Sequence, residues 1–298
     1  PFCKNYQGSY LVNYRYSTLG LLTSAGLLDI GDINTYQDLA FNINLPTTKL
    51  GTFGVFGLGG LSLSKNKIEK DTQLWDPIGE FNHYTFHSDM GAGGITHQYF
   101  FENNAYLKTS IALTSQRIAF ERDSISAVDF SEHRFNREHF TNTALRFSTF
   151  YNKKINTLHT IRFGTIISQL NFDLGSAGIN ELNQYETYLA DKGNAYTFQG
   201  FAQWKYKFTE RWILNTGVHY FHFQLNKVNS VEPRAGIQYQ INDIQTLSFG
   251  VGLHSRMEPM SLYNAYVLNE KGELGRFNQN LGLTKAYHYV LSYDRLLN

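Results

Sequence analysis

The sequence predicts an all-β fold, an antiparallel transmembrane β-barrel, and three observations point to it. Apolar and polar side chains alternate along most of the chain. Short and long connections alternate between the strand-like runs. Aromatic residues make up 15% of the chain and charged residues 17%, whereas soluble proteins carry about 25% charged residues.

The alternation is clearest in VEPRAGIQYQINDIQTLSFGVGLHSRMEP, residues 231–259. A period of two predicts a pair of strands, each with one apolar and one polar face, joined at Asn242-Asp243. Similar runs predict about twelve strands of about eight to twelve residues, close to the ~9–11 residues that cross a bilayer at a tilt. No segment shows a helical period.

The connections between these runs differ regularly in length. Short ones are expected at 46–49, 102–104, 152–156, 209–211 and 242–243, and long ones at 22–35, 61–89, 115–140, 169–195, 223–232 and 256–282. An outer-membrane barrel has short periplasmic turns and long extracellular loops. A soluble sandwich, propeller or lipocalin-like barrel also has alternating strands, but loops beyond about 12–15 residues are uncommon in it. The connections therefore favour the membrane barrel.

The alternation also assigns faces. The apolar positions are expected to face lipid, including Tyr239, Phe249, Val251, Trp204 and Leu214. The polar positions are expected to face the lumen, including Gln238, Gln240, Ser248, Lys205 and His288. Because only alternate residues meet lipid, a low mean hydropathy is compatible with a membrane barrel. No apolar run approaches the ~18 residues of a transmembrane helix.

Other classes of protein find little support. The net charge of +1 and the lack of a basic tract give no reason to expect nucleic-acid binding. The single cysteine, Cys3, excludes an internal disulfide and a cysteine-based zinc site. The pairs His83/His87 and His133/His139 fall in expected loops without a helical period, and no G-x-S-x-G motif is present. We therefore expect no enzyme, no catalytic residues, no metal and no cofactor.

Two pairs of stretches resemble a known family. SYLVNYRYSTLGLL (9–22) and YQDLAFNINLPTTKLGTFGVFGLGG (36–60) resemble early barrel strands of TonB-dependent outer-membrane receptors. The type concerned has a carboxypeptidase-regulatory-like N-terminal domain. VEPRAGIQYQINDIQTLSFGVGLHSRMEPMSLY (231–263) and NLGLTKAYHYVLSYDRLL (280–297) resemble later strands of the same receptors. The resemblance implies a bacterial outer-membrane protein with about 22 strands around a plug.

On that resemblance, residues 1–298 are expected to be a partial barrel domain. The plug, its TonB-contacting segment, the closing strands and the signal peptide are expected to lie outside this sequence. Edges near 9–17 and 285–295 would then lack partners. Glycines in the run 51–60 are expected to allow curvature or the close approach of another element such as the plug.

The resemblance implies uptake of a scarce nutrient, a ferric chelate, peptide or glycan, captured by extracellular loops. The implied partners are the TonB energy-coupling complex, the lipid bilayer, the nutrient and a surface lipoprotein. A passive porin or structural barrel without energy coupling is the alternative, and an outer-membrane hydrolase is a third reading.

Seven residues are candidates for ligand binding. A strand-to-loop exit combines Arg256, Glu258, Tyr263 and Tyr266. Three arginines on the polar positions, Arg15, Arg146 and Arg234, are expected to contact an anionic plug surface or ligand. Alternatively, they pair with lumen carboxylates such as Asp38 and Asp294.

Overall fold

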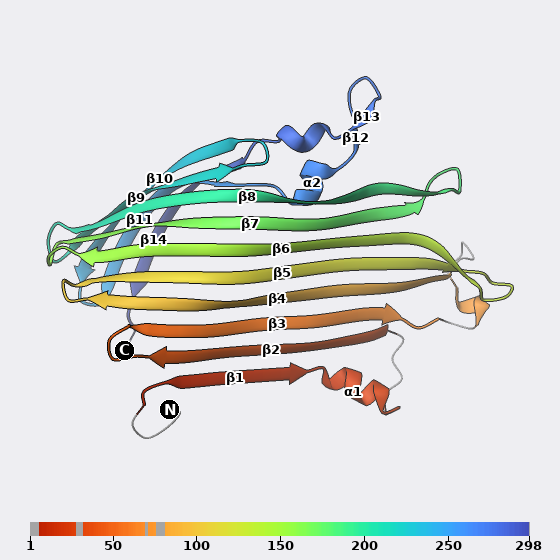
Figure 1. Cartoon of the computed structure of the whole chain (residues 1–298), viewed down its shortest axis with the longest axis horizontal. Coiled ribbons are helices and arrows are strands. Elements are labelled where there is room, and N and C mark those ends of the chain that lie inside the picture. Colours follow the sequence, from red (N-terminus) through yellow and green to blue (C-terminus); the bar gives the residue numbers. More distant parts are fainter. Residues whose placement is uncertain (1–5, 28–31, 69–70, 76–80, 298) are drawn as a thin grey trace.

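The computed structural model describes residues 6–27, 32–68, 71–75 and 81–297, so Cys3 lies outside the described residues. It is dominated by one antiparallel sheet of 12 strands, which follow one another in chain order except that β14 pairs with β11 (Figure 1). Its order is β1 (Ser9–Tyr16), β2 (Asp32–Pro46), β3 (Thr52–Asn66), β4 (Phe81–Phe101), β5 (Ala105–Ile125), β6 (Glu132–Lys154), β7 (His159–Ile179), β8 (Tyr185–Lys207), β9 (Trp212–Phe223), β10 (Val228–Asn242), β11 (Gln245–Arg256) and β14 (Thr284–Arg295).

Short helices and strands lie at one end of this sheet. They are α1 (Thr18–Ser24), η1 (Thr72–Leu74), α2 (Met260–Asn264), β12 (Val267–Leu268), β13 (Leu274–Gly275) and η2 (Phe277–Asn280). The sequence predicted no helix, but α1 forms because the Ser17 hydroxyl accepts a hydrogen bond from the Gly20 N–H at its first turn. No helix in the described part of the chain is long and apolar enough to cross a membrane.

The connections alternate between the two rims, as predicted. One rim carries the tight turns 47–51, 102–104, 155–158, 208–211 and 243–244, at the left of Figure 1. The other rim carries the connections from β1 to β2, from β3 to β4 and from β11 to β14, and the turns 126–131, 180–184 and 224–227. The turns expected at the first rim are confirmed to within a few residues.

The middle strands are longer than predicted. Strands β4 to β8 contain 21 to 23 residues each. The loops expected at 115–140 and 169–195 are therefore mostly strand, and only 126–131 and 180–184 turn. His83 and His87 lie on β4, and His133 and His139 lie on β6, not in loops.

The register places the predicted apolar positions on one face of the sheet, because directly paired residues in neighbouring strands share a face. One row of cross-strand partners runs from β1 to β8 as Tyr10, Ile43, Val55, Ile95, Ile111, Phe147, Ile167 and Phe198. The same pairing puts Trp204, Leu214, Tyr239, Phe249 and Val251 on this apolar face, and Lys205, Gln238, Gln240, Ser248 and His288 on the opposite, polar face.

The apolar face is a band that does not extend along whole strands. On β5 it includes Ile111 and Leu113, and the next residues on that face are Ser115 and Arg117. We call the portions of β4 to β8 beyond this limit, 81–90, 115–125, 132–143, 169–179 and 185–196, the protruding part. Its outer face is ionic: Asp173 lies 3.3 Å from His139 and 3.0 Å from Lys192.

In the protruding part the apolar side chains lie on the opposite face instead. Phe140 pairs with Leu174 there, and both belong to the face that is polar within the band. A hydrophobic core forms on this face, made of Phe172, Leu174, Leu189, Ala195, Phe221, Phe223, Met260 and Tyr263.

Residues 257–283, the covering segment, close this core. Tyr263 is 0% exposed, and its ring centroid lies 5.2 Å from that of Phe223. The Asn226 side-chain amide donates to the Leu281 carbonyl over 2.6 Å. Arg276 forms an ion pair of 3.0 Å with Asp191. The covering segment is therefore fixed to β8 and to the β9–β10 turn.

Hydroxyl groups pair across β5 and β6. Thr109 meets Thr149 at 3.0 Å, Ser110 meets Ser148 at 2.7 Å and Ser115 meets Thr143 at 3.1 Å. A slip of one residue would separate these hydroxyls and exchange the two faces of the strand. The pairs therefore favour the observed register.

The sheet is open, since its order begins with β1 and ends with β14. A closed barrel would pair these two strands. The open edges agree with the expectation that the 12 strands belong to a larger barrel.

Candidate functional site

A cationic cavity lies on the polar face between β6 and β10. Its volume is about 620 Å³. Arg162, Lys205, His219 and Arg234 line it, and no carboxylate does. The cavity is therefore suited to an anionic group.

Two arginines of the cavity have unused donors. The Arg162 guanidinium lies 3.9 Å from the ring centre of Phe150 and 5.6 Å from that of Phe201. The Nε atoms of Arg162 and Arg234 are buried and donate no hydrogen bond within the described residues. A buried donor without an acceptor is costly, so each of these two arginines is held with one donor unsatisfied.

A buried carboxylate outside the lining contacts two side chains of the cavity. Glu232 is 1% exposed and accepts a hydrogen bond from the Ser255 hydroxyl. It also lies 3.0 Å from His219 Nδ1 and 2.8 Å from an Arg234 terminal nitrogen. His219 Nε2 lies 3.1 Å from the Gln199 amide oxygen. These contacts fix the side chains of His219 and Arg234.

The predicted lumen arginines all lie on the polar face, but not together. Arg15 pairs with Asp38 at 2.9 Å, which is one of the two predicted roles. Arg146 donates from Nε to the Ser168 hydroxyl over 3.1 Å. Only Arg234 reaches the cavity. Because they stand on β1, β6 and β10, they do not form a single site.

The four residues predicted at the strand-to-loop exit have different surroundings. Tyr263 is in the core, where its hydroxyl accepts from the Glu258 N–H over 3.2 Å. The Glu258 carboxylate accepts from the Thr284 hydroxyl. Arg256 and Tyr266 are exposed, and the Arg276 guanidinium lies 5.0 Å from the centre of the Tyr266 ring. Of the four, Arg256 and Tyr266 are thus the most accessible.

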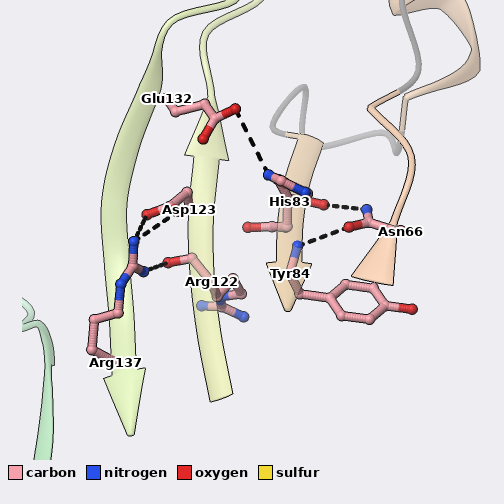
Figure 2. A network of polar contacts seen from close by, with 8 residues as sticks. Asn66, His83, Tyr84, Arg122, Asp123, Glu132 and Arg137 are labelled. Carbon is pink, nitrogen blue, oxygen red and sulfur yellow. Dashed lines mark hydrogen bonds and ion pairs between the residues drawn. The ribbon is translucent and has the colours of Figure 1, made fainter. Parts of the chain in front are cut away.

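A polar network joins strands at the protruding rim (Figure 2). Arg137 contacts both carboxylate oxygens of Asp123, at 2.6 and 2.8 Å, and donates to the Arg122 carbonyl over 2.9 Å. Beside it, His83 lies 3.7 Å from Glu132. The network ties β4, β5 and β6 together in a region that lipid does not cover.

Sequence reasoning missed Arg162, His219 and Glu232 as members of one site. The pairing that brings Arg162 to Arg234 spans β7 to β10. His219 and His222 lie on opposite faces of β9. Among the described residues, no group of three or more His, Cys, Asp or Glu side chains lies close enough to hold a metal ion.

The sheet has the architecture of part of an antiparallel β-barrel, with an apolar band on one face and a polar opposite face. The family model described as "TonB dependent receptor-like, beta-barrel" matches residues 6–287, and the chain belongs to this family. It is therefore a protein of the bacterial outer membrane, from a family of receptors rather than enzymes. A comparison with curated proteins found no match.

Solved structures of similar fold include three receptors or importers. The siderophore receptor PirA from Acinetobacter baumannii shares 17% identity with a TM-score of 0.61, covering 100% of this chain and 46% of its own. The RagAB peptide transporter shares 10% identity with a TM-score of 0.61, over 96% and 40%. The ferric-catecholate import receptor Fiu from E. coli K12 shares 10% with a TM-score of 0.56, over 98% and 53%. The chain thus spans about half or less of these proteins.

Proposed function

We propose that the chain is the barrel part of a receptor that imports a scarce nutrient across the outer membrane. The nutrient is a ferric chelate, peptide or glycan captured by extracellular loops and admitted through a plug driven by the TonB complex. The observation that carries the proposal is the cationic cavity on the polar face, with its two unused arginine donors. Membership of the receptor family and similarity to siderophore and peptide importers support it.

The cavity can serve this function in two ways. An acidic side chain of a plug can accept hydrogen bonds from Arg162 and Arg234, as can an anionic ligand. The covering segment lies at the opposite, extracellular end, where Arg256 and Tyr266 are accessible. We infer that capture takes place near these exposed residues and that the cationic cavity acts deeper in the lumen. A surface lipoprotein would approach the same extracellular end.

Conductance and uptake of the full-length protein test the proposal. A plugged receptor in planar bilayers should show almost no steady conductance, and a passive porin should show continuous ion flow. In cells, growth on ferric chelates, peptides or glycans as the sole source should require both the receptor and an intact TonB complex. Continuous conductance together with TonB-independent uptake would favour the porin alternative.

The cavity has its own test within this design. Arg162→Gln should lower uptake at limiting nutrient while the protein remains folded in the outer membrane. Lys108→Gln is the matched control, since Lys108 lies on the same face but is not part of the cavity. Equal uptake by both variants would remove the cavity from the transport route.

A further inference from the structure

Paired glycines replace large side chains in one region of the lipid-facing band. Gly57 pairs with Gly93 and Gly59 pairs with Gly91, across β3 and β4. All lie on the apolar face, because Gly57 and Gly59 also pair with Phe41 and Leu39 of β2. Because these glycines are on the apolar face, the expected approach of a plug on the polar face does not account for them.

Gly57, Gly59 and Gly93 form the floor of a groove of about 500 Å³, and Gly91 lies next to it. The side chains of Tyr14, Leu39 and Phe41 stand on the same face as one wall. A Cβ on Gly57 would come within 2.4 Å of the Phe41 ring, so that ring already covers Gly57. A Cβ on Gly91 or Gly93 would meet only backbone oxygens at 4.0 and 3.7 Å. The β4 side of the floor is therefore open.

A charged pair lies beyond the long-loop end of the groove, outside its lining. On β4 and β5, the next residues of the same face toward the long-loop rim are Asp89 and Arg117, whose side chains lie 3.9 Å apart. Arg117 is half-exposed. A hydrocarbon chain lying in the groove would therefore lead to a cation at the level where lipid headgroups begin.

Lipid is the occupant that this position favours. The groove lies on the apolar face, its lining is mostly apolar, and Arg117, paired with Asp89, lies beyond one end and offers a cation to a phosphate. Glycine in a strand interior weakens the strand, yet four occur here in register. We propose that the groove binds one acyl chain of a phosphorylated membrane lipid, with Arg117 contacting its phosphate.

Photolabelling of the full-length protein in phosphatidylcholine vesicles tests this site. The probe is phosphatidylglycerol with a diazirine in one acyl chain, present at a few mole per cent, and adducts are mapped by mass spectrometry. Labelling of 39–41, 57–61 and 91–93 should exceed labelling of 145–147 and 163–167 several-fold. Even labelling along the band would overturn the proposal.

Filling the groove with larger side chains should abolish the preferential labelling of the groove residues. The double variant Gly91→Val/Gly93→Val should reduce groove labelling to the level of the rest of the band. Gly236→Val/Gly250→Val is the matched control, because these glycines also pair in register, with room for a Cβ, but lie on the polar face. If the first variant does not fold, Gly91→Ala/Gly93→Ala should still give a partial reduction. Unchanged labelling in a variant that folds with the groove filled would refute the site. An adduct of the groove with another protein would also refute it.

The headgroup contact has a separate readout. Arg117→Gln should lower labelling by the phosphatidylglycerol probe several-fold relative to the wild type. Both proteins are labelled in the presence of excess unlabelled phosphatidylglycerol, which competes with the probe. A diacylglycerol probe with the same diazirine chain, which has no phosphate, should label wild type and variant alike. An equal effect on both probes would contradict a role for the Arg117 charge.

Discussion

The band and the protruding part of β4 to β8 belong to the same strands but arrange polarity in opposite ways. Within the band, Ile111 faces outward and its cross-strand partners, Ile95 and Phe147, are apolar. In the protruding part of the next two strands, His139 and Asp173 face outward, while Phe140 and Leu174 face the lumen side. Each strand therefore changes its apolar face once along its length.

The difference follows from what surrounds each part. In the band, lipid contacts the outer face, and apolar side chains there need no protein partner. Beyond it, water surrounds the outer face, so apolar side chains must find a core within the protein. The covering segment helps to supply that core through Met260 and Tyr263. The outer face of one strand is thus apolar where lipid surrounds it and polar where water surrounds it.

The largest effect is expected in the core of the protruding part. Tyr263→Ala should destabilise the packed covering segment by about 3–5 kcal/mol, as for other large aromatic truncations. Hydrogen exchange of the amides in 257–283 measures the loss. Tyr266→Ala is the control, because Tyr266 is 47% exposed and its removal should have little effect on exchange. Similar exchange in the two variants would mean that the core does not hold the segment.

A charge on the outer face should distinguish band from protruding part directly. Ile111→Arg, in the band, should destabilise the full-length barrel by about 2–4 kcal/mol, whereas Thr141→Arg, beyond it, should cost about 0–1 kcal/mol. Both positions are on the same face of neighbouring strands. Reversible folding into lipid vesicles measures the difference. Equal costs would place the membrane boundary elsewhere.

The ionic outer face should contribute less. Asp123→Asn removes the charge that contacts Arg137 at 2.6 Å, and it should weaken local stability by about 1 kcal/mol at low salt. Glu121→Gln is the control, because its contact with Arg137 is 3.5 Å long and should matter less. Hydrogen exchange over 120–138 at low and high salt measures both. A loss that does not diminish with salt would contradict an electrostatic origin.

The smallest effect is expected in the turn 126–131. The Ser131 hydroxyl and the Ser126 side chain donate hydrogen bonds that lower the pKa of Asp129 to about 2, and the Ser131 N–H adds to this shift. Because the folded pKa lies below the unfolded value of about 3.9, the stabilisation is present above pH 4 and is lost as the pH falls through 2. A ¹³C titration of the carboxyl checks the value, and Ser131→Ala should raise it. A midpoint near 4 in the wild type would exclude these bonds.

The fold class could be predicted because lipid imposes one rule on every strand of the band. The strand lengths could not be predicted from a single alternation, because the apolar side chains change face along a strand. On β5 they switch from Ile111 and Leu113 to Ile118 and Phe120. Allowing the apolar side chains to change face once along a strand would have predicted the longer strands. The cationic cavity was beyond reach, because it depends on the register of five strands and on contacts such as that of Arg162 with Phe150. The subtype with a carboxypeptidase-regulatory-like domain stays a prediction.

The hydroxyl pairs between β5 and β6 bear on how the barrel assembles. Each strand of the main sheet pairs with its predecessor, so the contacts that define its register are available as soon as the preceding hairpin exists. Local pairing of this kind shortens the search for correct partners. Thr109–Thr149 and Ser115–Thr143 lie on the same face of one hairpin and can test its alignment before later strands join. The barrel can therefore grow hairpin by hairpin, with an incorrect register rejected before the next strand is added.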